Sequence, residues 1–319
     1  MAVEAALSGL WTRDTSENVA SGFSRTSVRA VDCRQPGPRV RSILNGRKEG
    51  TVPETVDLYN NVYADFASRA EAAVRHDAFG EDIGQSSWLT ATEWLRFADQ
   101  AQVREGSHVL EVGSGSGGPA VYLATKRGCQ VTGVDINENG VKNGTRLAEL
   151  QGVGDRATFQ VVDASKPLPF PPASFDAVLS NDAMCHISNR QEVLEDWLRV
   201  LRPAGRMLFT DAMIVTGLVS QEELAIRSSI GFYLFVPPGE NERLITRAGF
   251  TLLSAEDLTW SAEAIAERWH DARERHRDAL VSREGEANFS GLQRFLTIVH
   301  KLSAERRLSR FGYLAEQTA

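Results

Sequence analysis

The stretch Val109–Asp135 reads VLEVGSGSGGPAVYLATKRGCQVTGVD and constrains the fold and function of this 319-residue chain more than any other segment. An apolar run ends in glycines at positions 113, 115, 117 and 118, a helix-like segment follows, and a second apolar run stops at Asp135. This order is typical of a strand–turn–helix–strand unit whose first turn holds a nucleotide-like ligand. Glycines let the backbone approach a ligand where a Cβ would collide, and Asp135 would accept hydrogen bonds from two ribose hydroxyls. The sequence therefore predicts a cofactor pocket.

The glycine spacing alone leaves the cofactor open. Gly113, Gly115 and Gly118 satisfy G-x-G-x-x-G, the dinucleotide pattern, and Asp135 lies about where an NAD-binding acid would lie. The same stretch also satisfies E-x-G-x-G-x-G, with Glu111 two residues before the first glycine. These two patterns favour NAD and a different adenosyl cofactor equally.

Three further observations separate the alternatives. The turn starts after more than a hundred residues, whereas a dinucleotide-binding half usually opens its own domain. Asp163-Ala164 follows a third apolar strand, where an acid would reach the exocyclic amine of an adenine. A continuous block, PLPFPPASFDAVLSNDAMCH, runs from Pro167 to His186, and VLRPAGRMLFTDAM follows from Val200 to Met213.

This ordered series resembles the S-adenosylmethionine-dependent methyltransferases with a Rossmann-like fold, over roughly Leu89 to Phe250. Within them, GEDIG at 80–84, SNDAMCHI at 180–187 and FTDAM at 209–213 resemble the small-molecule N-methyltransferases that act on sarcosine and dimethylglycine. The resemblance implies an α/β fold with a seven-stranded sheet whose last strand is antiparallel, helices on both faces and extra helical elements forming a cap. It also implies S-adenosylmethionine as the cofactor.

The composition of the chain argues against several classes of substrate and partner. A formal charge of −7 and an isoelectric point near 5.5 argue against nucleic-acid substrates, because cationic side chains supply most non-specific affinity for phosphate. No apolar run approaches the roughly 20 residues that span a bilayer, and Glu4 interrupts the start where a signal peptide would be basic. Three widely spaced cysteines, Cys33, Cys129 and Cys185, indicate a reducing, cytoplasmic setting with no disulfide framework, and they lack the spacing of a zinc or arsenite site. We expect no metal, no nucleic acid and no membrane.

The pattern of apolar residues predicts the organisation of the chain. Residues 1–50 form an N-terminal arm, either a flexible terminus or a segment that packs on a neighbouring subunit of a homo-oligomer. Residues 51–319 form the catalytic domain, with a core at 89–258 and helical insertions at 214–248 and 261–306. Helices are expected at 52–79, 89–99, 117–127, 138–151, 189–201, 240–248, 261–283 and 286–306, and strands at 109–113, 131–135, 158–162, 175–181, 205–211, 251–258 and 308–315, with a corner at Pro203-Ala204-Gly205.

The resemblance assigns the donor-binding residues. Glu111 would orient the glycine turn or the ammonium of the donor, Asp135 would hold the ribose, and Asp163 would bind the adenine. The full set predicted to bind the donor is Gln85, Ser86, Glu111, Gly113, Ser114, Gly115, Asp135, Ile136, Asp163, Ala164 and Asn181.

The residues that handle the methyl acceptor are predicted from residue type and place. His186 follows the fourth strand and suits proton transfer near neutral pH, and Asp182, at the carboxyl end of a strand, is the second predicted catalytic group. Aromatic side chains could stabilise a cationic amine through their faces. The predicted substrate residues are Tyr59, Tyr63, Trp88, Asp211 and Tyr233.

The sequence thus predicts methyl transfer to a small molecule, with an amine nitrogen as the favoured acceptor. Transfer to oxygen or carbon of a secondary metabolite is the alternative within the same class. An NAD-dependent oxidoreductase and a non-catalytic binding subunit are the alternatives outside it.

Overall fold

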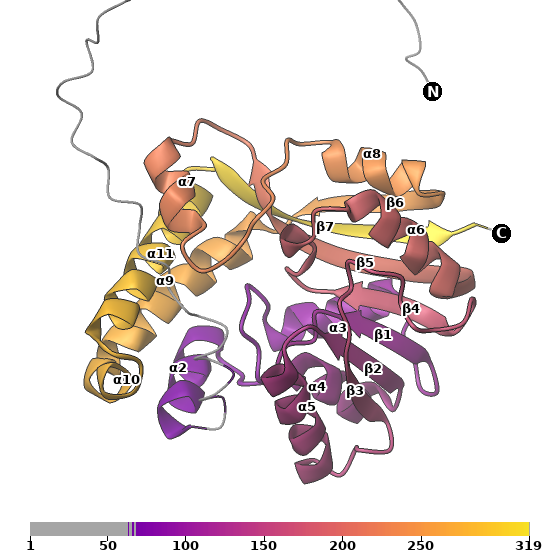
Figure 1. Cartoon of the computed structure of the whole chain (residues 1–319), viewed down its shortest axis with the longest axis horizontal. Helices are drawn as coiled ribbons and strands as arrows, with labels where there is room; N and C mark the ends of the chain where they lie inside the picture. The colour runs from indigo at the N-terminus through magenta and orange to yellow at the C-terminus, as the bar shows by residue number, and fades with distance from the viewer. Residues whose placement is uncertain (1–62, 64–65, 67, 319) are drawn as a thin grey trace, which may run out of the picture. The chain divides into compact units, whose positions relative to one another are not determined.

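The computed structural model describes residues 63, 66 and 68–318. Some predictions fall outside the described residues. These are the arm at 1–50, the predicted substrate residue Tyr59, and most of the positions before Ser68 in the helix predicted over 52–79. The described residues belong to the predicted catalytic domain (Figure 1).

The domain is built on one seven-stranded sheet with the order β3-β2-β1-β4-β5-β7-β6. The first five strands in this order are parallel, and β7 runs antiparallel to both of its neighbours, β5 and β6. The prediction of seven strands with an antiparallel last strand is confirmed. The strands are β1 (His108–Val112), β2 (Gln130–Asp135), β3 (Ala157–Val161), β4 (Phe175–Ser180), β5 (Leu201–Val215), β6 (Phe250–Asp257) and β7 (Leu308–Gln317).

Helices cover both faces of this sheet because successive residues of its central strands point to opposite sides. Val109 packs into a cluster with side chains of α3 and α4, whereas its neighbour Leu110 packs into another with side chains of α6 and α8. The helices are α2 (Arg69–Phe79), α3 (Ala91–Gln100), α4 (Gly118–Arg127), α5 (Glu138–Leu150), α6 (Arg190–Val200), α7 (Gln221–Arg227), α8 (Glu240–Arg247), α9 (Thr259–Arg275), α10 (Arg277–Glu284) and α11 (Glu286–Ala304), with a 3₁₀ turn η1 (Met184–His186).

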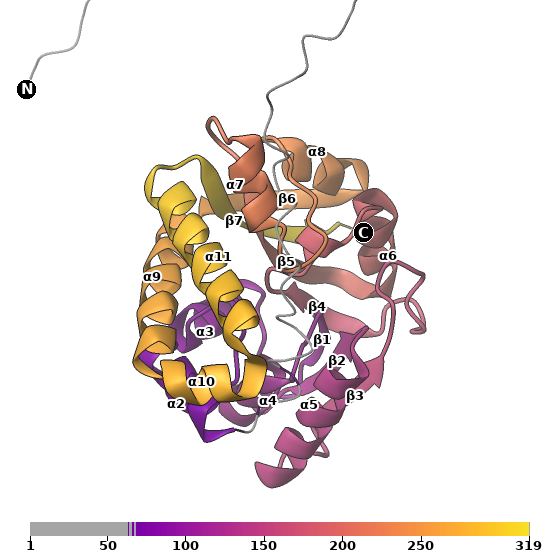
Figure 2. The same ribbon diagram turned by 60° about the vertical axis from the view of Figure 1, so that its left-hand side comes forward.

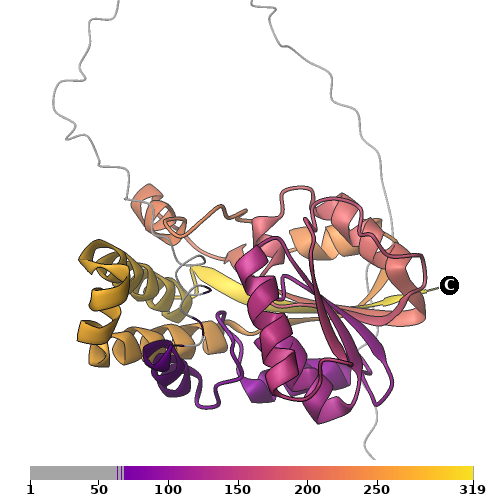
Figure 3. The ribbon, with the colours of Figure 1, turned by 60° about the horizontal axis from the view of Figure 1, so that its bottom comes forward.

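A helical layer lies beside one end of the sheet. Figures 2 and 3 show α9, α10 and α11 grouped there, next to α2. The layer has its own apolar core, in which Trp269 of α9 and Phe295 of α11 pack against Trp88. No helix in the part of the chain that the structure describes is both long and apolar enough to cross a bilayer.

Several predicted boundaries were wrong. The helix predicted over 52–79 has its N-cap at Ser68 and begins, as α2, at Arg69. The single helix predicted over 261–283 is broken at His276 into α9 and α10. The corner predicted at Pro203-Ala204-Gly205 lies inside β5, where Ala204 has a φ of 61° and the register against β4 shifts. Proline and glycine therefore mark an irregularity within a strand here instead of its beginning.

Candidate active site

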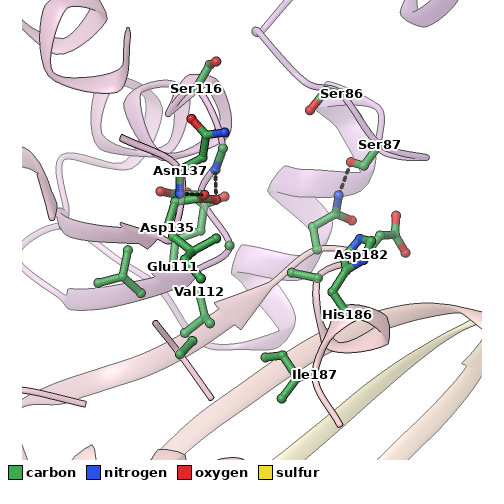
Figure 4. Close-up of a pocket in the computed structure, with 18 of the residues that line it drawn as sticks. Ser86, Ser87, Glu111, Val112, Ser116, Asp135, Asn137, Asp182, His186 and Ile187 are labelled. Carbon is green, nitrogen blue, oxygen red and sulfur yellow. Dashed lines mark hydrogen bonds between the residues drawn. The ribbon is translucent and has the colours of Figure 1, made fainter. Parts of the chain in front are cut away.

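A cavity of about 840 Å³ opens at the carboxyl ends of β1, β2 and β4. The sheet order reverses between β1 and β4, and ligands of open α/β sheets bind at such a point. Every residue predicted to bind the donor lines this cavity. In Figure 4, Glu111 and Asp135 lie on one side of it, and Ser86, Ser87, Asp182 and His186 lie on the other.

The glycine turn is fastened to the end of β2 by backbone hydrogen bonds. The N–H groups of Gly113 and Ser114 donate to the carbonyl of Val134 at 2.8 and 3.0 Å. Gly113 has a φ of 75°, and a Cβ there would overlap the side chain of Ala183. Glycine is needed at this position both for the left-handed backbone and for the close approach of the loop after β4.

Asp135 is held in place by the same turn. Its Oδ2 accepts a hydrogen bond from the Gly115 N–H at 2.8 Å, and its Oδ1 accepts one from the Asn137 N–H at 2.8 Å. Burial raises the pKa of the Asp135 carboxyl. The carboxylate is fixed at the tip of β2, and each oxygen has lone-pair capacity for a further donor such as a ribose hydroxyl.

Glu111, at the end of β1, carries an unsatisfied polar atom into the cavity. The side chain is 2% exposed, and its Oε2 has no hydrogen-bond partner among the described residues. Burial, and secondarily the negative charge of Asp135, raises the pKa of Glu111 to about 8. A buried carboxyl left unsatisfied is costly, and the ammonium of an aminoacyl group would relieve that cost. The residues present therefore fit an adenosyl cofactor with an amino-acid tail.

Two further residues predicted to bind the donor follow the ends of β3 and β4. Asp163 is exposed and accepts hydrogen bonds from the backbone and hydroxyl of Ser165, which lower its pKa. Asn181 donates to the hydroxyl of Ser87 and accepts from Arg310 at 2.9 Å, so its side chain is held in one orientation.

Asp182 lies in the site, but its carboxylate belongs to a buried ion-pair network. Arg310 of β7 donates from Nε to both oxygens of Asp182 at 3.0 and 3.2 Å, and the Trp88 N–H donates to Oδ2 at 3.3 Å. Arg310 also donates to Glu93 at 2.9 Å. Because the carboxylate of Asp182 is engaged by Arg310 and by the Trp88 N–H, the catalytic role predicted for Asp182 stays a prediction.

His186 ends the 3₁₀ turn after β4 and lines the cavity. Its Nδ1 lies 2.8 Å from the carbonyl oxygen of Phe232. Because a carbonyl can only accept, Nδ1 carries the proton and Nε2 is the basic nitrogen of the neutral ring. Burial, and to a smaller extent the nearby charge of Arg227, lowers the pKa of His186. The histidine is thus held as a neutral base of one tautomer.

Asp211 lies outside the cavity, contrary to the prediction that it binds substrate. Its side chain is fully buried and accepts from Arg190 at 2.7 Å and from Asn241 at 3.1 Å, while Oδ1 caps the Met213 N–H. Asp211 lies inside β5, which continues to Val215 beyond the strand end predicted at 211, and this ion pair encloses its carboxylate, so that carboxylate cannot meet an acceptor.

The predicted aromatic residues divide between two spaces. Tyr63 lines the main cavity, and burial raises the pKa of its hydroxyl. Trp88 and Tyr233 instead line a smaller neighbouring pocket. Sequence reasoning missed Arg310 and Arg227, since each is an isolated arginine in a strand or helix and nothing in the local pattern marks it.

The comparisons with known proteins agree with this site. Residues 110–209 match the family model described as a methyltransferase domain. The chain is 31% identical over 230 residues to 27-O-demethylrifamycin SV methyltransferase of Amycolatopsis mediterranei, covering 70% of this chain and 84% of that protein. It is also 31% identical over 224 residues to the glycine/sarcosine/dimethylglycine N-methyltransferase of Actinopolyspora halophila, covering 66% of this chain and 39% of that protein.

Solved structures share the fold. The phosphoethanolamine N-methyltransferase 2 of Haemonchus contortus, in complex with phosphomonomethylethanolamine and S-adenosylhomocysteine, superposes with a TM-score of 0.69 at 21% identity, over 82% of this chain and 60% of that one. The chain belongs to the S-adenosylmethionine-dependent methyltransferases with a Rossmann-like fold. Its cofactor is S-adenosylmethionine. Among the described residues, no group of three or more His, Cys, Asp or Glu could hold a metal ion.

Proposed function

We propose that the enzyme transfers the methyl group to a hydroxyl oxygen of a small molecule, with His186 as the general base. The observation that carries this proposal is the 2.8 Å distance between Nδ1 of His186 and the carbonyl oxygen of Phe232, from which we infer that Nδ1 holds the proton and Nε2 is basic. The nitrogen acceptor favoured by the motifs becomes the second candidate.

Oxygen and nitrogen acceptors differ in whether they need a general base in the protein. An amine nitrogen can lose its proton to solvent before transfer and then attacks through its lone pair. A hydroxyl remains a weak nucleophile until its proton is removed in the transition state, and a positioned base contributes about 10²–10⁴-fold to such a step. A neutral histidine at the cavity wall is the feature that oxygen transfer requires and nitrogen transfer does not.

The charges of the described residues at the acceptor end support the same choice. The carboxylate of Asp182 is paired with Arg310, and that of Asp211 is paired with Arg190. The buried cation Arg227 adds to the effect of burial in lowering the pKa of His186, whereas Asp211 and Asp182 act to raise it. A protonated amine would meet a cation here, and the two nearby carboxylates are each already engaged by an arginine.

The division of work among residues follows from their places. When bound, S-adenosylmethionine supplies a methyl group on a positively charged sulfur. Asp135 would hold the ribose, Asp163 the adenine and Glu111 the ammonium, while the glycine turn brings the backbone against the donor. His186 would receive the hydroxyl proton at Nε2 as the new O–CH₃ bond forms, and it would return that proton to solvent.

Nitrogen methylation is favoured by a separate observation, the likeness to enzymes whose names specify nitrogen acceptors. A stretch of 159 residues is 38% identical to the sarcosine/dimethylglycine N-methyltransferase of Halorhodospira halochloris. Both candidates use the same donor residues and differ only in the need for His186.

The test compares matched acceptors on the wild type and His186→Ala. Purified enzyme is incubated with S-adenosylmethionine and a panel of phenol, alcohol and amine pairs of equal skeleton, and products are identified by mass spectrometry. We expect methyl ethers from the wild type and a loss of about 10²–10⁴-fold in kcat in the variant. His76→Ala, on the exposed face of α2, is the control. Methylamine products alone, or full ether formation by His186→Ala, would refute the oxygen proposal.

A further inference from the structure

A small pocket, here called the inner pocket, adjoins the main cavity on the side of the helical layer. It measures about 30 Å³ and shares Ser86, Ser87 and Asp182 with the main cavity. A cavity needs a volume of about 10–15 Å³ to hold one water molecule, so the inner pocket has room for about two oxygen-sized groups. It can accept the end of a molecule whose body lies in the main cavity.

Arg227, the last residue of α7, lines the inner pocket and is buried to 2% exposure. Its guanidinium lies over the ring of Tyr233 at 4.6 Å and over the ring of Phe295 at 4.9 Å. Stacking satisfies the faces of the guanidinium but leaves its in-plane N–H groups in need of acceptors.

Acceptors for two of the three guanidinium nitrogens are missing from the described part of the chain. Nε and Nη1 of Arg227 are buried there without a hydrogen-bond partner, and no carboxylate forms an ion pair with this arginine. By contrast, the buried arginines Arg190 and Arg310 each have a carboxylate within 3.0 Å. A buried cation without a counter-ion is strongly unfavourable unless an anion binds.

The carboxylate of Asp182 also lines the inner pocket, but it is engaged by Arg310 at 3.0 Å. Burial lowers the pKa of the nearby His186; among the neighbouring charges, Arg227 acts in the same direction, and Asp211 and Asp182 act against it. The floor of the pocket is aromatic, formed by Trp88, Trp269 and Phe295.

We propose that the inner pocket binds a carboxylate of the methyl acceptor, with Arg227 as its counter-ion. The two oxygens of a carboxylate match the room available, and a guanidinium presents donors in the plane that a carboxylate needs. This inference deepens the proposed function and rests on it only for the identity of the second group, the hydroxyl. The substrate class is then a hydroxy acid whose carboxylate lies beside Arg227 and whose hydroxyl is directed toward His186.

The test measures binding without methyl transfer, so that its result is independent of the acceptor atom. The protein saturated with S-adenosylhomocysteine is titrated by calorimetry with two acid and amide pairs, benzoate with benzamide and acetate with acetamide. The members of each pair have nearly the same shape and differ in charge. We expect the wild type to bind at least one acid roughly 10–100-fold more tightly than its amide.

Arg227→Met should reduce that preference to within about twofold, while Arg227→Lys, which keeps the charge without the planar fork, should retain part of it. Arg277→Met is the matched control, since Arg277 also stacks on a ring, that of Phe289 at 4.7 Å, but lies on α10 away from both pockets. An affinity for S-adenosylhomocysteine equal to that of the wild type shows that a variant is folded.

Two results would overturn the proposal. The first is a wild type that binds neither acid better than its amide, which needs no variant and would mean that only water satisfies Arg227. The second is a preference for the acid that survives in a folded Arg227→Met protein. Neither result would affect the oxygen proposal, which the methylated products decide.

Discussion

The guanidinium of Arg310 lies against the carboxylate of Asp182, with Nε 3.0 Å from Oδ1, although the two residues are 128 positions apart in the sequence. Their side chains are 0% and 6% exposed. Asp182 has a φ of 52°, a conformation that non-glycine residues seldom adopt. The antiparallel strand β7 therefore fixes the loop after β4 that carries Asn181 and His186 into the cavity.

Removing the cation of this pair should destabilise the protein severely. Arg310→Met leaves the carboxylates of Asp182 and Glu93 buried without compensation, and breaking a buried pair in this way costs about 3–5 kcal/mol. The free energy of unfolding, measured by urea denaturation, should fall by that amount. Lys142→Met is the control, because its ion pair with Glu138 is about 70% exposed on both sides and should contribute less than about 0.5 kcal/mol. A loss below about 1 kcal/mol in Arg310→Met would contradict the role given to the pair.

The glycine turn can be tested by adding a single methyl group. Gly113→Ala should prevent S-adenosylhomocysteine binding, because the new Cβ overlaps Ala183 and the left-handed backbone is disfavoured for alanine. Gly152→Ala separates the two causes, since Gly152 has a φ of 67° but no atom within 4 Å of the place where a Cβ would stand. We expect Gly152→Ala to cost about 1 kcal/mol of stability and to bind normally. Calorimetric titration of both variants decides the point; normal binding by Gly113→Ala would be inconsistent with the tight approach of the loop.

The position around the cavity of the residues predicted to bind the donor could be foreseen from the sequence for a physical reason. These residues follow directly after short apolar strands, and the carboxyl ends of parallel strands meet at one edge of the sheet. Glu111, Asp135 and Asp163 therefore come together through local order alone. The glycine turn between Glu111 and Asp135 can be recognised in the sequence, because residues with a Cβ would clash there.

The acceptor half could not be predicted in the same way. Arg310 and Arg227 reach the site from β7 and α7, far along the chain, and their contacts depend on how the helical layer packs. Asp211 shows the reverse error: the sequence places it at a strand end like Asp135, but β5 continues to Val215, and Arg190 and Asn241 enclose its carboxylate. Strand ends thus predict which side chains lie at the edge, while long-range packing decides which of them remain accessible.

The pH dependence of turnover should report the state of His186. Burial lowers its pKa from the ordinary value of 6.5, so the ring is neutral and able to accept a proton above that pH. We expect kcat with a hydroxyl acceptor to be constant above about pH 6.5 and to fall at lower pH as the ring becomes protonated. The residual activity of His186→Gln should lack this acid limb. A wild-type rate that keeps rising through about pH 8 would indicate a base with a higher pKa.

The buried carboxyl of Glu111 should make the stability of the free protein depend on pH. Its pKa is about 8 in the folded protein against 4.5 for an ordinary glutamate, so between these values the folded chain holds a proton that the unfolded chain has lost. The stability of the free protein should therefore decrease as the pH rises from about 4.5 to about 8, because the proton is bound to the folded state.

Donor binding should depend on pH in the opposite direction to stability. The reason is that the ammonium of the donor favours the ionised carboxylate of Glu111. The affinity for S-adenosylhomocysteine should rise between about pH 6 and about pH 8, by at most tenfold per unit, and binding should release a proton. Calorimetry in two buffers of different ionisation enthalpy measures that proton directly. Glu111→Gln keeps the shape and removes the titration, so it should lose most of the slope. If that variant retains the whole slope of the wild type, Glu111 does not meet the ammonium, and the unsatisfied carboxyl at the end of β1 needs another explanation.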